Sequence, residues 1–301
     1  MKSKANKSFE ERTRYRIRGG TAGPRSWFIR YRKAVSLRTT LERRRSARAL
    51  AGPAFTVPPR KGFLVLPPGR FREVDEVVDA AHRAVADTDM QARIDAGHKP
   101  FLVSLMKSAD LTLDSPYMRL ALRPDIIAAV ATYLGTMPIL EYVNVLCSNH
   151  VADAPAKSQL LHCDSDDTTQ LKIFVLCTEV DAESGPLTVL PADSSERLRD
   201  AVEYRHNRRV TDEALTKVLG TDVDLRAMVG PPGTLCCVDT SRCFHYGSRI
   251  DKPAGRRVVV MLQYITPWAF ILPPRFSEAA RFRRLAAGTS DRLTRAVLGA
   301  A

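Results

Sequence analysis

Apolar residues recur at helical spacing in the first half of this chain. In residues 71–88, Val74, Val77, Ala81 and Val85 fall on one side of a helix of 3.6 residues per turn. A second helix is expected over residues 124–135, which begin with Pro-Asp and end with Gly. Both helices come before the region in which the pattern changes to that of strands.

After residue 138 the pattern consists of short apolar or β-branched runs, separated by Gly, Pro and Asp turn signals. The expected strands are ILEYVNVLC, QLKIFVLCTEV, GPLTVLP, GTLCCVD and RRVVVMLQYI, with GFLVLPP before the first helix and one helical insertion at SSERLRDAVEY. Because helices do not alternate with these strands, a parallel sheet is disfavoured. The pattern favours a mainly β protein with flanking helices, namely a cupin-like double-sheet jelly roll with helices over one face.

The charge is concentrated at one end of the chain. Of the net charge of +13, residues 1–60 hold 17 Lys and Arg against 3 acidic residues, whereas the remainder holds 29 against 30. The expected organisation is therefore a basic N-terminal arm and linker over residues 1–60, and a catalytic or binding domain over residues 61–301 with a C-terminal helical tail. The body lacks the basic excess of a nucleic-acid-binding domain, and we expect it to fold without the arm.

Within the basic arm, Trp27, Tyr31 and Leu41 recur at helical spacing and predict a weakly amphipathic basic helix. Two interpretations are open. The helix packs on the body, or it contacts an anionic surface such as a membrane, a nucleic acid or a phosphorylated partner.

Six cysteines lie in the middle of the chain without a CxxC pair, so neither a cysteine zinc site nor a disulfide framework is indicated. Reduced thiols in the cytoplasm are the simplest interpretation. The sequence has no uninterrupted apolar run of membrane-spanning length, and no apolar segment follows its basic start as in a secretory signal. We expect a cytoplasmic protein without a transmembrane segment.

A histidine and an aspartate, His162 and Asp164, stand two residues apart in LLHCD. In a strand such residues project from the same face, so both can bind one metal ion while Cys163 points away. His245, at the end of GTLCCVDTSRCFH, is a third ligand if its strand returns beside the first. Two histidines and one carboxylate with open positions opposite them form the facial triad of non-haem Fe(II) oxygenases.

An arginine follows the third ligand by eleven residues. Arg256 opens the strand RRVVVMLQY, where it can make a bidentate, charge-assisted pair with the far carboxylate of 2-oxoglutarate. Arg257 points to the other face and is the alternative if the strand register differs by one.

These motifs together resemble the phytanoyl-CoA dioxygenase family of Fe(II)/2-oxoglutarate oxygenases. The matching stretches are HCD, DAESGPLTVLPAD, GTLCCVDTSRCFHYGS with its following arginine, GFLVLPP and MRLALRPDIIAAVATYLG, within residues 62–270. The resemblance implies a double-stranded β-helix in which His162, Asp164 and His245 hold Fe(II) and Arg256 anchors 2-oxoglutarate, with O₂ as the other cosubstrate.

The resemblance further implies hydroxylation of a small-molecule or acyl/lipid-type substrate, with release of succinate and CO₂. Asp164 favours hydroxylation, because related halogenases give up the carboxylate ligand to make room for halide. Lys172 and Phe174 share one face of the strand after the HCD motif and are either cosubstrate-pocket residues or ordinary strand residues. The alternative from another functional class is a cupin-like, non-catalytic binding or scaffold protein with a basic arm. Neither the substrate nor the oligomeric state follows from the sequence.

Overall fold

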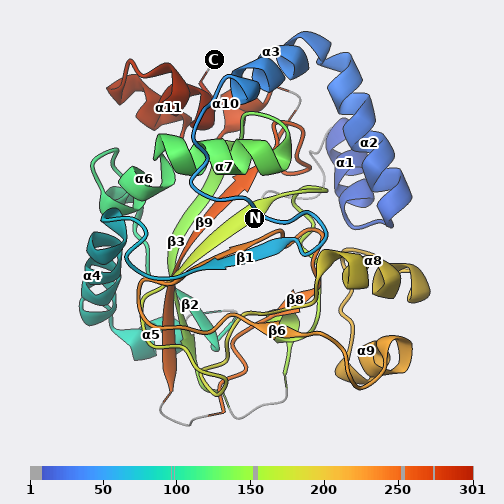
Figure 1. The fold of residues 1–301 in the computed structure, drawn as a ribbon, viewed down its shortest axis with the longest axis vertical. Helices are drawn as coiled ribbons and strands as arrows, with labels where there is room; N and C mark the ends of the chain where they lie inside the picture. The colour runs from blue at the N-terminus through green and yellow to red at the C-terminus, as the bar shows by residue number, and fades with distance from the viewer. Residues whose placement is uncertain are drawn as a thin grey trace.

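Two antiparallel sheets and several groups of helices make up the molecule (Figure 1). The computed structural model describes residues 9–300 except 96, 98, 152–154, 252–254 and 274. The larger sheet has the strand order β1-β7-β4-β9-β3-β2, and the smaller one has the order β6-β5-β8. The strands are β1 (Phe63–Leu66), β2 (Leu102–Ser104), β3 (Ile139–Asn149), β4 (Leu171–Leu176), β5 (Thr188–Val189), β6 (Arg226–Ala227), β7 (Leu235–Val238), β8 (His245–Tyr246) and β9 (Arg256–Ile265).

Helices precede, interrupt and follow these strands, and they are more numerous than a mainly β chain requires. The prediction of antiparallel strands with flanking helices is confirmed, whereas the described chain is better called mixed α and β. The helices are α1 (Phe9–Arg18), α2 (Ala22–Val35), α3 (Leu37–Arg48), α4 (Glu73–Ala86), α5 (Met90–Asp95), α6 (Pro116–Ala121), α7 (Pro124–Leu134), α8 (Ala192–Ala201), α9 (Asp212–Leu219), α10 (Phe276–Ala279) and α11 (Arg292–Val297).

Local sequence signals account for the ends of the helix that was clearest in the sequence. Helix α7 begins at Pro124, whose missing N–H costs nothing at the first position of a helix. It stops at Gly135, which adopts a left-handed conformation with φ of 67°. Between these ends every residue from Ile126 to Ala131 is buried. The predicted helix over 124–135 is therefore confirmed to within one residue.

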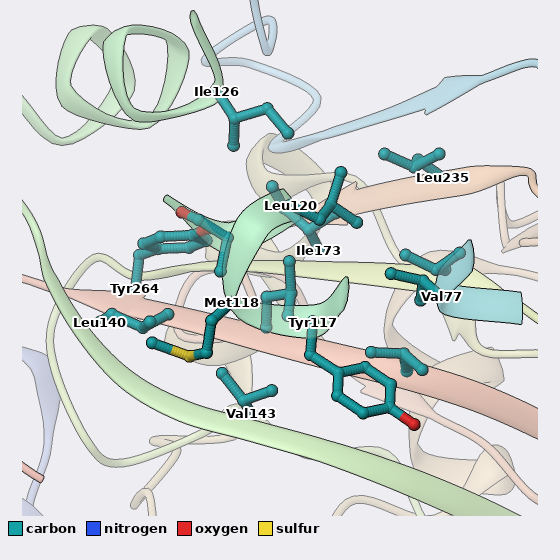
Figure 2. Packing of buried hydrophobic residues seen from close by; sticks show 14 of the residues in the cluster. Val77, Tyr117, Met118, Leu120, Ile126, Leu140, Val143, Ile173, Leu235 and Tyr264 are labelled. Carbon is teal, nitrogen blue, oxygen red and sulfur yellow. The ribbon is translucent and has the colours of Figure 1, made fainter. Parts of the chain in front are cut away.

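The main core lies between one face of the larger sheet and helices α4, α6 and α7 (Figure 2). Along β9, Val258, Val260, Leu262 and Tyr264 point into this core. The residues between them point to the opposite face, because side chains alternate along a strand. The two faces of the larger sheet thus have separate uses, one for packing on helices and one for the site described below.

The N-terminal helices α1–α3 pack on the body through apolar and polar contacts. Phe28 and Ile29 of α2 are buried against Trp268 and Phe270, and the rings of Phe28 and Phe270 stack with centroids 5.6 Å apart. These aromatic residues follow β9 directly, so α2 covers the exit of the strand that supplies the cavity arginine described below.

Buried arginines extend this interface. Arg32 donates to the carbonyl oxygens of Trp268, Ala269 and Leu272 at 2.7–3.0 Å, and Arg43 of α3 donates to that of Pro138 at 3.0 Å. Of the two interpretations of the basic helix, packing on the body is confirmed for the side of α2 that carries Phe28, Ile29 and Arg32. The contacts argue against the separable, solvated arm expected from the charge, and the boundary at residue 60 stays a prediction that a truncation tests.

Candidate metal centre and its cavity

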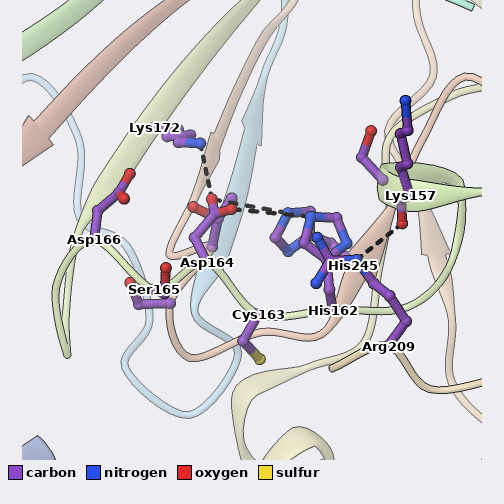
Figure 3. A network of polar contacts seen from close by, with 12 residues as sticks. Lys157, His162, Cys163, Asp164, Ser165, Asp166, Lys172, Arg209 and His245 are labelled. Carbon is purple, nitrogen blue, oxygen red and sulfur yellow. Dashed lines mark hydrogen bonds and ion pairs between the residues drawn. The ribbon is translucent and has the colours of Figure 1, made fainter. Parts of the chain in front are cut away.

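The structure brings the three expected ligands together (Figure 3). His162 pairs with His245 in an antiparallel bridge, with N–O distances of 3.0 and 2.9 Å between their backbones. The Nε2 atoms of both histidines lie 3.9 Å from the Asp164 carboxylate, one from each oxygen. Cys163 points away from the group in Figure 3, as the alternation along a strand requires.

Both imidazoles are oriented by their own backbone. The Nδ1 atom of His162 lies 2.9 Å from the carbonyl oxygen of Leu160, and that of His245 lies 3.0 Å from the carbonyl oxygen of Cys243. A carbonyl accepts only, so each Nδ1 carries the proton and each Nε2 presents a lone pair to the centre of the group. Burial lowers the pKa of His162 to about 3 and also lowers the pKa of His245, which keeps both rings in the neutral form that binds metals.

The carboxylate of Asp164 is held by two further side chains. Lys172 donates to its Oδ2 atom at 2.8 Å, and Gln170 donates to the same oxygen at 3.1 Å. Burial opposes ionisation of Asp164, but the charge and hydrogen bond of Lys172 hold the pKa of this carboxyl well below its usual range. The third ligand is therefore an oriented anion, as a divalent cation requires.

A hydrogen-bonded chain leads from this carboxylate to the N-terminal helices. Gln263 donates to the Oε1 atom of Gln170 at 3.2 Å and to Asp166 at 3.0 Å. Asp166 in turn forms an ion pair with Arg18 of α1 at 2.5 Å. An outer partner of the metal centre thus comes from the segment that the sequence marked only as basic.

The three ligands lie at the wall of a cavity of about 590 Å³, on the face of the larger sheet opposite the helices. The strands contribute apolar side chains to its lining, among them Phe174, Leu176, Val259 and Met261. Phe174 and Lys172 both line it, as their shared strand face suggested. Their role toward a cosubstrate stays a prediction.

The arginine that lines this cavity is Arg257, and not Arg256. Arg256 is exposed at the start of β9 and shares its strand face with Val258 of the main core. Arg257 shares a face with Val259, Met261 and Gln263, because side chains alternate along a strand, and Ser148 of β3 pairs with it in the sheet register. Arg257, the register alternative, is therefore the arginine of the cavity, while the anchoring role expected for Arg256 stays a prediction, since the strand alternation could not be assigned to a face before the register was known.

Arg257 is buried without an acidic partner among the described residues. Its Nη2 atom donates to the hydroxyls of Ser148 and Ser248 at 3.0 and 3.3 Å, and Nη1 donates to the carbonyl of Gly185. Its Nε atom has no partner. Burial lowers the pKa of Arg257 to about 10, which leaves the side chain charged at neutral pH.

Glu141 also lines the cavity, although no sequence motif pointed to it. The pairing of β3 with β9 shifts register at Glu141, and such irregularities redirect side chains. Its Oε2 atom is buried without a partner, and burial raises the pKa of Glu141 to about 7. The sequence signal for this residue is that a single Glu interrupts the apolar run ILEYVNVLC. His150, just beyond the end of this strand, donates through Nδ1 to the carbonyl oxygen of Ile250 and is not among the cavity residues.

No family model and no curated protein matches this chain. Among solved structures, EctD from S. alaskensis with 2-oxoglutarate and 5-hydroxyectoine is similar at 20% identity and a TM-score of 0.49, over 73% of this chain and 74% of that one. The non-heme alpha ketoglutarate dependent epimerase SnoN from nogalamycin biosynthesis is similar at 18% identity and a TM-score of 0.44, over 68% and 78%.

HygX from Streptomyces hygroscopicus, with nickel and 2-oxoglutarate bound, is similar at 15% identity and a TM-score of 0.45, over 68% of this chain and 83% of that one. Because identities and TM-scores are low, the evidence for the chemistry is the geometry of this chain's own residues. His162, Asp164 and His245 are, in number and kind, the ligand set of non-haem iron oxygenases, and that set agrees with the resemblance seen in the sequence.

Proposed function

We propose that this protein is a non-haem Fe(II)- and 2-oxoglutarate-dependent dioxygenase that hydroxylates a small-molecule or acyl/lipid-type substrate, with release of succinate and CO₂. The observation that carries the proposal is the pairing of two features in one cavity. The two oriented imidazoles and one carboxylate can hold a divalent metal at its wall. The unpaired guanidinium of Arg257 lies in the same cavity and lacks an anion.

The residues present fit this metal and this cosubstrate. A dicarboxylate keto-acid has one end that chelates a metal and a distant carboxylate that needs a cation, and Arg257 is the cavity cation with a buried nitrogen left free. Ser148 and Ser248 flank the guanidinium with hydroxyls 2.9 Å apart, and both hydroxyls can turn to donate to the same carboxylate. We assign the anchoring role to Arg257 rather than to Arg256, with Phe174 packing beside the keto-acid.

The metal, when bound, supplies the open positions at which a keto-acid chelates and O₂ is reduced. This chain's residues provide the rest of the site. His162 and His245 present their Nε2 atoms, and Lys172 and Gln170 orient the Asp164 carboxylate. Because Asp164 keeps the third ligand position, hydroxylation is the outcome we propose. We also propose that the two antiparallel sheets are those of a double-stranded β-helix, and that the protein, whose six cysteines are free and buried, works in the reducing cytoplasm.

Anaerobic titration of the full-length protein with Fe(II) and 2-oxoglutarate tests the metal centre. The chelate should produce a weak visible charge-transfer band that His162→Ala abolishes. His82→Ala is the matched control, since His82 is an exposed helical residue that lies outside the cavity. Equal bands in the two variants would contradict the assignment of His162 as a metal ligand.

A pair of adjacent variants tests the cosubstrate anchor. We expect Arg257→Met to weaken 2-oxoglutarate binding by roughly 100-fold, through loss of a charge-assisted bidentate pair, while Fe(II) binding is kept. Arg256→Met should leave both affinities unchanged, because Arg256 is exposed. Succinate release above a metal-free control separates the enzyme from the alternative, a non-catalytic cupin-like scaffold.

A further inference from the structure

The N-terminal helices carry an exposed apolar stripe. Among the described residues most of the large hydrophobic side chains that are exposed belong to α1–α3. Trp27, Tyr31 and Val35 follow one another at intervals of four residues along α2, so they lie on one side of this helix. The rings of Trp27 and Tyr31 stack with centroids 5.8 Å apart. On α3, which begins after Ser36, Leu37 and Leu41 are likewise exposed and four residues apart.

The orientation of this stripe is determined by the opposite side of the same helices. Arg25 and Arg32 of α2 are buried and donate to body carbonyls, including those of Asp167 and Trp268. Because these bonds hold α2 in one rotation, Trp27 and Tyr31 face solvent while arginines face the protein. Phe28 and Ile29 share the buried side with these arginines, so α2 carries apolar residues on its exposed side in addition to its buried one. We conclude that the aromatic side is available to something other than the protein's own core.

Cations surround the stripe. Arg30, Arg44, Arg45 and Arg48 are exposed, and none forms an ion pair among the described residues. The only acidic residue of α3, Glu42, is paired with Arg38. On α3, Arg44 and Arg48 fall on the same side as Leu37 and Leu41 at intervals of three and four residues. The surface therefore combines exposed apolar side chains with exposed arginines.

We propose that this stripe, defined by Trp27, Tyr31, Val35, Leu37 and Leu41, docks the protein on the surface of an anionic lipid membrane. Aromatic and aliphatic side chains of one helix side insert at the boundary between head groups and acyl chains, and flanking arginines pair with lipid phosphates and carboxylates. A nucleic acid would use the arginines and the rings but not Val35, Leu37 and Leu41. Docking of this kind is peripheral, and no helix in the described part of the chain is long and apolar enough to cross a bilayer.

Co-sedimentation of the full-length protein with vesicles tests the proposal. Vesicles of phosphatidylcholine with 30% phosphatidylserine, a composition chosen for the assay at about 0.1 M salt, should bind the protein, and phosphatidylcholine alone should bind it far more weakly. Trp27→Ser/Tyr31→Ser should reduce binding by roughly 10- to 100-fold, because the buried apolar area is lost. Arg44→Gln/Arg45→Gln should reduce binding and its dependence on salt.

Val229→Ser is the matched control, since Val229 is an exposed apolar residue of the body. Tryptophan fluorescence gives a second readout, because Trp27 is 64% exposed and the other tryptophan, Trp268, only 3%. Trp27 should become shielded from acrylamide on vesicles. Equal binding by the stripe and control variants, or absence of binding to the anionic vesicles, would overturn the proposal. The proposal would also be overturned if the stripe variant, but not the control, lost binding to a single-stranded oligonucleotide. Loss of self-association in the absence of lipid, again in the stripe variant alone, would overturn it as well.

Discussion

Buried arginines occur in two regions of this molecule, and their hydrogen bonds differ. In the N-terminal helices, Arg25, Arg32 and Arg43 donate to backbone carbonyls and have no buried nitrogen without a partner. In the cavity, Arg257 has hydroxyl partners and one buried nitrogen that is free. Burial lowers the pKa of Arg25, Arg43 and Arg257 alike, to about 10. The pKa therefore does not distinguish the cavity arginine from those of the N-terminal helices, whereas the hydrogen bonds of their buried nitrogens do.

The two kinds of arginine also differ in what their removal would leave behind. Arg25 satisfies the backbone of Ser165 and Asp167, in the loop that follows the HCD motif. Removing it leaves buried acceptors unpaired, which costs free energy. Removing Arg257 instead removes a buried charge that has no counterion in the protein alone. The two kinds of variant should therefore affect different measurements.

Deleting residues 1–57 should have the largest effect. Trp268 and Phe270 would lose the cover of Phe28 and Ile29, and the carbonyls after β9 would lose the donors of Arg32. We expect insoluble protein, or a melting temperature lower by about 10 °C or more, together with loss of the iron chelate band. Thermal unfolding and the anaerobic titration measure both. A truncated protein with wild-type stability and chelate would restore the separable arm inferred from the charge.

Arg25→Met should reduce the free energy of unfolding by about 2–4 kcal/mol, because the carbonyls of Ser165 and Asp167 stay buried without donors. Urea unfolding of the protein without ligands measures the change.

Arg257→Met is the matched variant for this measurement. Its unliganded stability should stay within about 1 kcal/mol of wild type, since an uncompensated charge is removed with the hydrogen bonds. It should lose the stabilisation that saturating 2-oxoglutarate gives wild type, about 2.7 kcal/mol at 100 times the dissociation constant. The comparison fails if Arg257→Met is the more damaging variant without ligand.

Glu141 should show a smaller effect that depends on pH. Burial raises its pKa to about 7, above that of an unfolded Glu, so the native protein binds an extra proton between these two values. The contribution of Glu141 to the free energy of unfolding therefore falls as the pH rises toward 7, and it is constant above about pH 7. Glu141→Gln should be more stable than wild type by about 1–3 kcal/mol at pH 8, with a smaller difference at pH 5. Urea unfolding at both pH values checks this, and a difference independent of pH would contradict it.

The smallest effect is expected at an exposed pair. Arg38 and Glu42 lie one turn apart on α3 with 2.9 Å between Nε and Oε1, and both are exposed. Glu42→Gln should leave the free energy of unfolding unchanged within the error of the measurement, because solvent screens the pair. Urea unfolding of the variant and of wild type measures the change. A loss of stability as large as that of Arg25→Met would show that burial does not explain the difference between Arg38 and Arg25.

The candidate site was predictable where its residues are close in sequence or have a chemical signature. His162 and Asp164 share a strand face by spacing alone, and the metal chemistry of His245 suggested that it joins them. Lys172 and Phe174 followed from the same alternation. Glu141 and Gln263 could not be found this way, because each depends on the pairing of β3 with β9.

The sequence by itself determined the local elements and the ligand set, since these depend on the spacing of residue types along the chain. It also determined that the positive charge lies at the N-terminal end. Only the tertiary structure decided that Arg257 and not Arg256 enters the cavity, because a shift of one residue in register exchanges the two faces of a strand. It likewise decided that Arg25 and Arg32 face the protein while Trp27 faces solvent, because distant backbone carbonyls supply the acceptors that make a buried arginine stable.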